Sequence, residues 1–355
     1  MSKRIRVAVL GAGIGQAHLS GYAEVSDLFE VVYVCDLNLD KAKAGAALAP
    51  DSLAVTDIQQ VLNDASIDVV DVCLPPHLHA PITIAALEAG KHVIGEKPIA
   101  GSLHDVDRIA AAAVKAGRQV FPIFQYRYGA GYRAAHELKQ RGMLGKPYVF
   151  ALETHWQRGA DYYAERWRGS WKGELGGAIV SHAIHAHNLI TLLAGDITDV
   201  AAFLDTRVNP IETEDCVAIS MRTVEGALVT SSITLGAAGS QSRFRACFEH
   251  VTLTSAIEPY HVGAGPWKFE ATDPNRQAEF DAVLAAVPPV LERFAGQFSD
   301  IYAHLAGQPD LYRPDFAESR HSIEVITALY DSAQNGRVVH LPLAEDHPLK
   351  NGWQK

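Results

Sequence analysis

Long hydrophobic runs are missing from this sequence, and so are closely spaced cysteines and any excess of positive charge. No segment approaches the roughly 18 uncharged apolar residues that a membrane-spanning helix requires. The four cysteines, Cys35, Cys73, Cys216 and Cys247, lack the spacing of a zinc site or a disulfide framework. We therefore expect buried free thiols in a reducing compartment, and no membrane partner.

The charge balance excludes further classes of partner. A formal net charge of −10 argues against a nucleic acid or an anionic membrane surface as the main partner. The chain begins Met1-Ser2-Lys3-Arg4 without the apolar core and cleavage site of a secretory signal, so we expect a cytoplasmic protein. With 355 residues, 48% of them hydrophobic and 20% charged, the sequence has a globular composition and length enough for two domains.

Short, nearly continuous apolar runs alternate with helix-like stretches in the first third of the chain. Such runs are typical of parallel strands that are buried on both faces. They are Ile5–Leu10, Val31–Cys35, Val69–Leu74, Lys91–Gly95 and Gln119–Ile123, and the helices between them include Ile82–Ala89 and Val106–Ala116, the second preceded by a cap-like segment at Ser102. This pattern predicts a doubly wound, parallel α/β sheet over residues 1–123.

The pattern changes after residue 123. Strands with polar–apolar alternation are expected from about residue 200 to 254, including an antiparallel hairpin of Val217–Arg222 and Ala227–Thr234. Further elements are expected at Tyr132–Arg141, Tyr148–His155, Gly176–Gly195, Phe294–Ala306, Ser319–Ala333 and Val338–Leu341. The sequence therefore predicts a second, α+β domain with a largely antiparallel sheet over residues 124–355.

A glycine-rich segment, made of Gly11, Ala12, Gly13, Ile14 and Gly15, follows the first predicted strand and opens a helix. Glycines there let the backbone approach a dinucleotide pyrophosphate, whose charge meets the N–H groups of the helix N-terminus. Asp36 ends the second apolar run, where a carboxylate accepts ribose hydroxyls and repels a 2′-phosphate, with Asn38 in support. The pattern favours NAD over NADP, although Asp36 could also be an ordinary turn residue at the end of a strand.

Two further segments, residues 74–79 and 96–98, follow predicted strands at the edge where ligands bind in such sheets. Prolines in the first segment end a strand and begin a helix, and from this position they could also line a nicotinamide pocket. We assign to the cofactor site the residues Leu74, Pro75, Pro76 and His79.

The second segment is Glu96-Lys97-Pro98, after the fourth apolar run. Lys97 could hydrogen-bond a substrate oxygen and stabilise negative charge during hydride transfer, and Glu96 could orient it. On the tripeptide alone, a solvated surface ion pair is the more common alternative.

In their order and spacing, these segments resemble the glucose–fructose oxidoreductase / inositol dehydrogenase (Gfo/Idh/MocA) family over essentially the whole chain. The matching segments are the glycine loop with His18, residues 75–79, 90–93 and 96–98, Gly176-Gly177 with His185, and residues 320–326 before Leu341-Pro342. The resemblance implies a Rossmann domain, a C-terminal domain with an open, mainly antiparallel sheet, and NAD as cofactor. It also implies a catalytic Lys97, a Lys97–Pro98 bond that is often cis, and a homodimer or homotetramer.

A histidine-rich helix carries the second signature that the resemblance implies: an Asp followed four residues later by a His. The His falls on His185, but Ser181 holds the Asp position, and a serine cannot carry charge. Because positions 181, 185 and 188 share one helical face with 182 at its edge, we predict His185 as general base or acid, with His182 or Ser181 replacing the Asp. The alternatives are a metal site of His182, His185 and an outside carboxylate, or packing against aromatic residues, which we prefer for His187.

The segment Arg158–Lys172 is rich in Trp, Tyr and Arg. Sugars bind by stacking on aromatic faces and by directed hydrogen bonds, although the same composition suits a subunit interface. Gln125 and Arg127 follow the last strand of the first domain and could contact nicotinamide or substrate, or brace the domains. We assign Gln125 with Glu96 and Lys97 to the cofactor, and to the substrate Lys97, Arg127, Tyr163, Arg168, Trp171, Lys172, His182 and His185.

These observations predict an NAD-dependent dehydrogenase that moves a hydride between nicotinamide and a carbinol carbon of a sugar, polyol or cyclitol, without a metal. In this prediction Lys97 and His185 come from separate domains to one substrate oxygen. One alternative is an enzyme of the same family that oxidises transiently with tightly held NAD and then eliminates, which cleaves a glycoside without net redox change. Another is a non-catalytic NAD-sensing regulator, against which the retention of Lys97 and His185 argues.

Overall fold

The computed structural model describes residues 3–308 and 313–354. It divides into two compact units: a first unit of residues up to 125 together with 293–320, and a second unit of residues 126–292 together with those from 321 onward. Residues 293–320 lie in the first unit, whereas the sequence assigned all of residues 124–355 to the second domain. Within the described ranges, no helix is long and apolar enough to cross a membrane.

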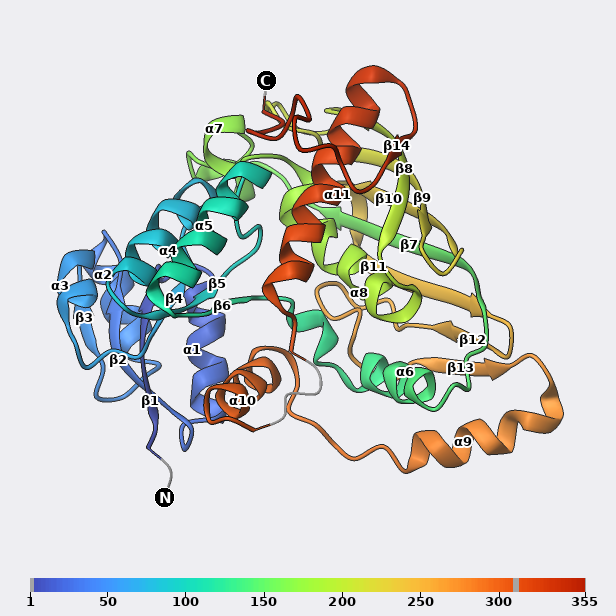
Figure 1. Ribbon diagram of the computed structural model, residues 1–355, viewed down its shortest axis with the longest axis horizontal. Coiled ribbons are helices and arrows are strands. Elements are labelled where there is room, and N and C mark those ends of the chain that lie inside the picture. Colours follow the sequence, from blue (N-terminus) through green and yellow to red (C-terminus); the bar gives the residue numbers. More distant parts are fainter. Residues whose placement is uncertain (1–2, 309–312, 355) are drawn as a thin grey trace. The chain divides into compact units, whose positions relative to one another are not determined.

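A six-stranded parallel sheet, in the order β3-β2-β1-β4-β5-β6, forms the centre of the first unit (Figure 1). Its strands are β1 (Ile5–Leu10), β2 (Phe29–Cys35), β3 (Leu53–Val55), β4 (Val69–Val72), β5 (His92–Gly95) and β6 (Val120–Pro122). Its helices are α1 (Gly15–Glu24), α2 (Leu39–Ala46), α3 (Ile58–Asn63), α4 (His79–Glu88), α5 (Leu103–Ala116) and α10 (Arg293–Leu305). The predicted doubly wound sheet is confirmed.

Hydrophobic burial explains these elements. Residues 7–10 of β1 and all of β4 are buried, as expected for strands covered on both faces. Phe294 and Phe298 of α10 join the core formed by β1 and α1, which is why residues distant in sequence belong to the first unit. The predicted helix cap is also confirmed, because the Ser102 hydroxyl accepts a hydrogen bond from the Asp105 amide at 3.0 Å.

An eight-stranded sheet, in the order β13-β12-β11-β7-β10-β9-β8-β14, forms the second unit. Its strands are β7 (Pro147–Gln157), β8 (Ile197–Asp205), β9 (Cys216–Thr223), β10 (Leu228–Thr234), β11 (Gly236–Phe248), β12 (Val251–Thr254), β13 (Lys268–Ala271) and β14 (Val339–His340). The β7–β10 pair is parallel and the other pairs are antiparallel, so the predicted mainly antiparallel sheet is confirmed.

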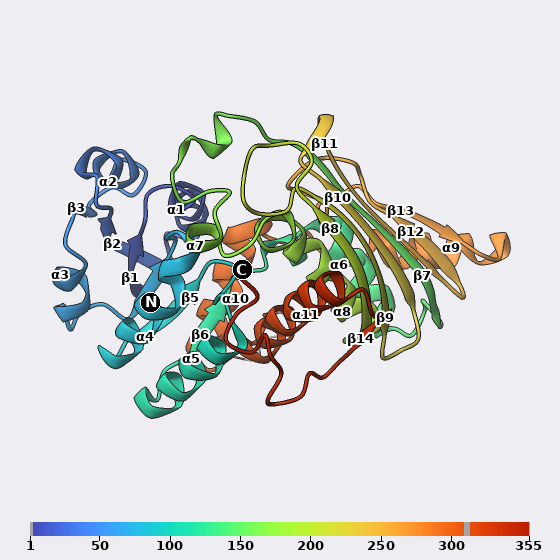
Figure 2. The same ribbon diagram turned by 90° about the horizontal axis from the view of Figure 1, so that it is seen from above.

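Helices cover one face of this sheet, as Figure 2 shows for α8 and α11. The helices of the second unit are α6 (Ala130–Gln140), α7 (Trp171–Glu174), α8 (Ile184–Ala194), α9 (Gln277–Ala285) and most of α11 (Phe316–Asn335). His187 of α8 contacts the Ser231 hydroxyl on β10, and Ser332 of α11 accepts a hydrogen bond from the Ala202 amide on β8. On β10 the residues flanking Ser231 are exposed, so the opposite face of the sheet is uncovered in the described chain.

Candidate active site

The predicted cofactor residues lie at one edge of the first unit's sheet. Strands β1, β4 and β5 are neighbours, and their last residues are in register, Leu10 with Val72 and Val72 with Gly95. The glycine loop, Leu74 and the Glu96–Lys97 pair follow these three strands directly. Parallel strands thus bring together three motifs that are spread over residues 11–97 of the sequence.

Close backbone approach explains the first glycine of the loop. Gly11 has a φ of +97°, and a Cβ atom at this position would lie 2.3 Å from the carbonyl oxygen of Cys73. A Cβ atom at Gly13, in contrast, would meet nothing within 4 Å. The loop is therefore packed tightly on its inner side and open at Gly13, as a phosphate-binding turn requires.

Asp36 is held against this loop. One oxygen of its carboxylate accepts a hydrogen bond from the Ala12 amide at 2.9 Å, and the other accepts from the Asn38 amide, also at 2.9 Å. The Asn38 side-chain oxygen caps α2 by accepting from the amides of Asp40 and Lys41. The carboxylate is thus fixed beside the glycine loop, while the oxygen of Asn38 serves the helix.

His79 joins the loops that follow β4 and β5. Its Nδ1 lies 2.6 Å from the Pro98 carbonyl oxygen, and its Nε2 lies 2.6 Å from that of Leu74. The Lys97–Pro98 bond is cis, as the family resemblance implied. Because both ring nitrogens contact protein carbonyls, His79 links these two loops.

Gln125 offers a test of whether the residues present fit NAD. Its side chain is buried, and its Oε1 atom has no hydrogen-bond partner. A buried polar atom without a partner costs free energy unless a ligand satisfies it. An acceptor of this kind suits a carboxamide N–H group, and the open backbone at Gly13 suits a phosphate, so the residues fit the cofactor.

A buried network under the Glu96–Lys97 segment was missed by the sequence reasoning. His18 on α1 places Nδ1 2.8 Å from Asp71 and Nε2 3.0 Å from Glu96, and Asp71 also accepts the hydroxyl of Tyr22 at 2.9 Å. Burial lowers the pKa of His18, but its polar partners, above all the Asp71 carboxylate, outweigh burial and raise this pKa well above its usual value. Burial and Asp71 raise the pKa of Cys73, which therefore stays a neutral thiol.

His18, Asp71 and Cys73 are also the one cluster of three metal-ligand side chains among residues 3–308 and 313–354. The 2.8 Å separation of His18 and Asp71 is a hydrogen-bond distance. Ligands around a tetrahedral zinc lie about 3.3 Å apart, from bond lengths near 2.0 Å. The cluster is therefore built as a hydrogen-bonded network.

The predicted histidine helix of the second unit is not regular. Residues Ile179–Ala183 form a π-helical turn before α8 begins. The expected regular helix is therefore interrupted at Ser181, because a π-helical turn contains an additional residue, whereas His185 and Asn188 both lie in α8, three residues apart. The Ser181 hydroxyl donates to Glu174 at 2.8 Å, and Glu174 is only 2% exposed. A buried carboxylate thus lies next to the serine that holds the Asp position.

The three histidines have different surroundings. The ring of His182 lies 5.0 Å from that of Trp156 and 5.7 Å from that of Tyr162. His185 stacks on Tyr126 at 4.7 Å. His187 is buried and contacts Ser231 on β10, and burial lowers its pKa to about 4, so its hydrogen-bond contact is with the sheet and packing against the aromatic segment stays a prediction.

Glu214 holds the beginning of this helical segment. Its carboxylate accepts the amides of Gly177 and Ile179 and the hydroxyl of Tyr330, all at about 3 Å. A Cβ atom at Gly177 would lie 1.9 Å from the Glu214 carbonyl oxygen, which explains the second glycine of the pair. Burial raises the pKa of Glu214 to about 7. Nothing in the sequence pattern indicated this residue.

The predicted substrate residues of the aromatic segment 158–172, together with Arg127, separate into two groups. Arg168 lies over the rings of Tyr162 and Trp167, at 3.9 and 4.2 Å, and Tyr163 packs edge-on against Tyr162. The remaining predicted substrate residues lie elsewhere: Trp171 packs on Tyr330, Lys172 is exposed, and Arg127 is 1% exposed and donates to Asn188 at 2.7 Å.

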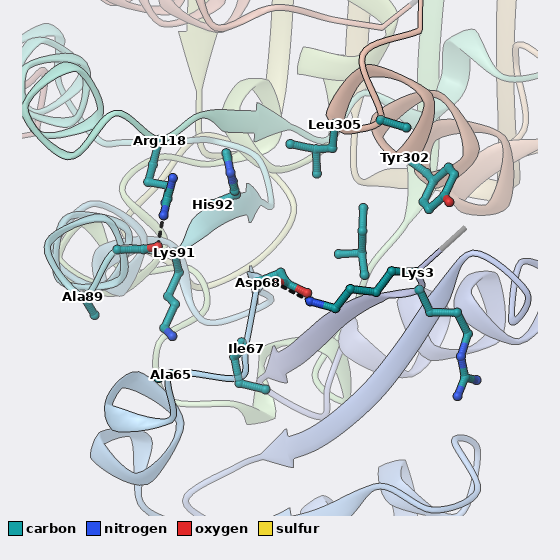
Figure 3. A pocket seen from close by; sticks show the side chains of 14 residues that line it. Lys3, Ala65, Ile67, Asp68, Ala89, Lys91, His92, Arg118, Tyr302 and Leu305 are labelled. Carbon is teal, nitrogen blue, oxygen red and sulfur yellow. Dashed lines mark hydrogen bonds and ion pairs between the residues drawn. The ribbon is translucent and has the colours of Figure 1, made fainter. Parts of the chain in front are cut away.

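A cavity of about 680 Å³ lies elsewhere in the first unit (Figure 3). Its lining includes Lys3, Asp68 and His92, at or next to the amino ends of β1, β4 and β5. Lys3 pairs with Asp68 at 3.9 Å, and Arg118 donates to the carbonyl oxygen of Gly90. This cavity is at the edge opposite the glycine loop, so it is not the predicted cofactor site.

Comparisons with known proteins agree with this geometry. Residues 5–124 match the profile of an oxidoreductase family with an NAD-binding Rossmann fold, and residues 132–254 match the GFO/IDH/MocA C-terminal domain. An uncharacterised oxidoreductase of Schizosaccharomyces pombe is 27% identical over 330 residues, which is 84% of this chain and 88% of the relative. Inositol 2-dehydrogenase 3 of Saccharopolyspora erythraea is 37% identical over 145 residues, 40% of this chain and 43% of that enzyme.

A solved structure covers nearly the whole chain. The WlbA dehydrogenase from Bordetella pertussis, in complex with NADH and UDP-GlcNAcA, superposes with a TM-score of 0.84 at 25% identity. The superposition covers 96% of this chain and 100% of that protein. Both matched domains and the fold are thus shared with enzymes that use a nicotinamide cofactor.

Proposed function

Because the chain belongs to the Gfo/Idh/MocA oxidoreductase family, we propose that it is an NAD-dependent dehydrogenase of an alcohol group in a sugar, polyol or cyclitol. The observation that carries this proposal is the edge of the first unit's sheet. There the glycine loop, Asp36 and Lys97 follow β1, β2 and β5 at the carboxyl end of each, with β1 next to β2 and β4 between β1 and β5. This arrangement supplies a dinucleotide cradle with a lysine in the same row of loops.

NAD accepts or supplies the hydride when it is bound. The N–H groups of Gly13, Ile14 and Gly15 would face its pyrophosphate at the N-terminus of α1. Asp36 would accept the ribose hydroxyls, and its charge would disfavour a 2′-phosphate. The Oε1 atom of Gln125 would accept from the carboxamide of the nicotinamide, which gives this buried atom a partner.

Lys97 and His185 divide the proton and charge chemistry. The Lys97 ammonium would donate to the substrate oxygen and stabilise the negative charge that develops on it. His185 would take the hydroxyl proton, a role that suits an imidazole and typically contributes about 10²–10⁴-fold to rate. Lys97 belongs to the first unit and His185 to the second.

Glu174 would supply the negative charge that Ser181 lacks. Its buried carboxylate accepts the Ser181 hydroxyl at 2.8 Å and contacts Arg168 at 3.4 Å. His182 would contribute a second imidazole beside this pair, because it packs against the same Tyr162 ring that Arg168 covers.

The substrate would be a sugar-like molecule held by aromatic and basic side chains of residues 158–172. Tyr163 and Arg168 are half-buried and both contact Tyr162, whose ring lies near His182, so they have the best support as substrate contacts. Lys172 is exposed and Trp171 packs on Tyr330, so these two would contact a substrate at its periphery. Arg127 is proposed to brace Asn188, because it is almost completely buried.

A homodimer or homotetramer would bury the uncovered face of the second unit's sheet. Val149 and Leu228 are about half exposed there and are paired in register. Phe203 on β8 is 82% exposed. An apolar surface of this kind is typical of subunit interfaces.

The test is incubation of the protein with NAD⁺ and a panel of sugars, polyols and cyclitols, with NADH absorbance as the readout. We expect accumulation of NADH with at least one compound, and loss of turnover by at least about 10²-fold in Lys97→Met, since an electrostatic contact is removed. The matched control is Lys115→Met on the exposed side of α5, which should behave as wild type. Glycoside cleavage without NADH accumulation would instead identify the oxidation–elimination reaction. Unchanged turnover in Lys97→Met would refute the role of this lysine.

A further inference from the structure

The Glu96–Lys97 segment rests on charged groups in the interior of the first unit. His18 is 0% exposed and is clamped between the carboxylates of Asp71 and Glu96, at 2.8 and 3.0 Å. The second oxygen of Glu96 accepts a hydrogen bond from the backbone amide of Lys97 at 3.1 Å. A continuous chain of hydrogen bonds therefore runs from the centre of α1 to the backbone of Lys97.

The protonation of His18 follows from its partners. Both ring nitrogens face carboxylate oxygens, which only accept hydrogen bonds when ionised. Each nitrogen must then carry a hydrogen, so His18 is an imidazolium. The Tyr22 hydroxyl and the neutral Cys73 thiol complete the polar surroundings by donating to Asp71, at 2.9 and 3.4 Å.

Aromatic rings seal this charge from water. Phe294 and Phe298 of α10 lie 4.4 and 5.6 Å from the imidazole ring, and no titratable group of α10 faces it in the described contacts. In such a low-dielectric setting, a charge-assisted hydrogen bond is strong and directional. Glu96 therefore has one preferred position, which is set by His18.

We propose that His18 is a positioning residue of this enzyme: through its bond to Glu96 it fixes the backbone of Lys97 at the carboxyl end of β5. The inference rests on the proposed role of Lys97 in the reaction. Glu96 carries this link, because its two oxygens contact the buried imidazole and the Lys97 amide. A displacement of about 1 Å in a group that contacts the reacting atoms can cost about 10²-fold in rate.

The experiment compares His18→Gln with the exposed control His104→Gln on α5. Amide hydrogen exchange is followed by mass spectrometry in the peptide that contains Lys97, and kcat and the NADH dissociation constant are measured alongside. We expect faster exchange in this peptide and a fall in kcat of about 10²-fold in His18→Gln. The affinity for NADH should stay within about threefold of wild type, because the glycine loop and Asp36 are unaltered.

A second variant tests the link through Glu96. Glu96→Gln should accelerate exchange in the same peptide, and the double variant should lose little more kcat than His18→Gln alone, because the two residues act as one unit. If His18→Gln does not fold, Glu96→Gln still tests the link by exchange.

Three results would overturn the proposal: unchanged exchange near Lys97, additive losses in the double variant, or a loss of NADH affinity as large as the loss in kcat. The last result would show that His18 serves only as a general scaffold. If wild type oxidises no compound of the panel, the proposed function fails, whereas the exchange measurement still decides whether His18 fixes Lys97.

Discussion

Glu214 lets the pH dependence of stability be predicted in detail. Its carboxyl group is 4% exposed and lies at the start of the histidine-bearing helical segment, where it accepts hydrogen bonds from Gly177, Ile179 and Tyr330. Burial raises its pKa from the usual 4.5 to about 7, although the donors around it act in the opposite direction. The folded second unit therefore holds a proton at pH values where the unfolded chain has lost it.

The sign of the effect follows from linkage. A carboxyl group whose pKa is raised by folding stabilises the folded state least when it is ionised, so stability falls as pH rises from about 4.5 to about 7. Integrated between about pH 5 and about pH 8, this difference in pKa corresponds to a loss of about 2–3 kcal/mol. Glu214→Gln cannot ionise, so its stability should lack this part of the pH dependence.

Tryptophan fluorescence gives a selective assay. All five tryptophans, Trp156, Trp167, Trp171, Trp267 and Trp353, belong to the second unit. Urea unfolding of wild type, Glu214→Gln and the exposed control Glu258→Gln would be followed at about pH 5 and about pH 8. From about pH 5 to about pH 8, the free energy of unfolding should fall in wild type and in the control. We expect this fall to be about 2–3 kcal/mol larger than the fall in Glu214→Gln. Equal pH dependence in all three proteins would refute the reasoning.

Three further predictions concern the cofactor loop and assembly. Asp36→Ser should raise kcat/KM with NADP by about tenfold, because the charge that repels a 2′-phosphate is lost. Steady-state kinetics with NAD and NADP test this, and an unchanged preference for NAD over NADP would contradict it. Gly11→Ala should lose NADH binding in a fluorescence titration, since its Cβ atom would lie 2.3 Å from the Cys73 carbonyl oxygen. Gly13→Ala has open space at its Cβ position and should fold normally. Equal behaviour of the two variants would speak against the tight loop. Phe203→Arg should lower the mass measured by light scattering if the exposed sheet face joins subunits, and a mass that does not change would exclude this face at Phe203.

Local patterns determined much of this protein. The apolar runs predicted five of the six strands of the first sheet, and turn residues such as Gly226 predicted the β9–β10 hairpin correctly. β3 was missed because it has only three residues and none of them is buried. The glycine loop, Asp36 and Glu96-Lys97-Pro98 were recognisable because each follows a strand whose apolarity is visible in the sequence itself.

Only the tertiary structure decided which residues support these motifs. His18 meets Asp71 and Glu96, which lie 53 and 78 positions away, because parallel strand order places α1, β4 and β5 side by side. No periodicity encodes such a meeting, and the same is true of Glu214 against Gly177. The return of residues 293–320 to the first unit likewise depends on aromatic packing between α10 and α1. A sequence displays the periodicity of its own segments, whereas the partners of a buried charge are chosen by three-dimensional packing, which must satisfy every polar group it removes from water.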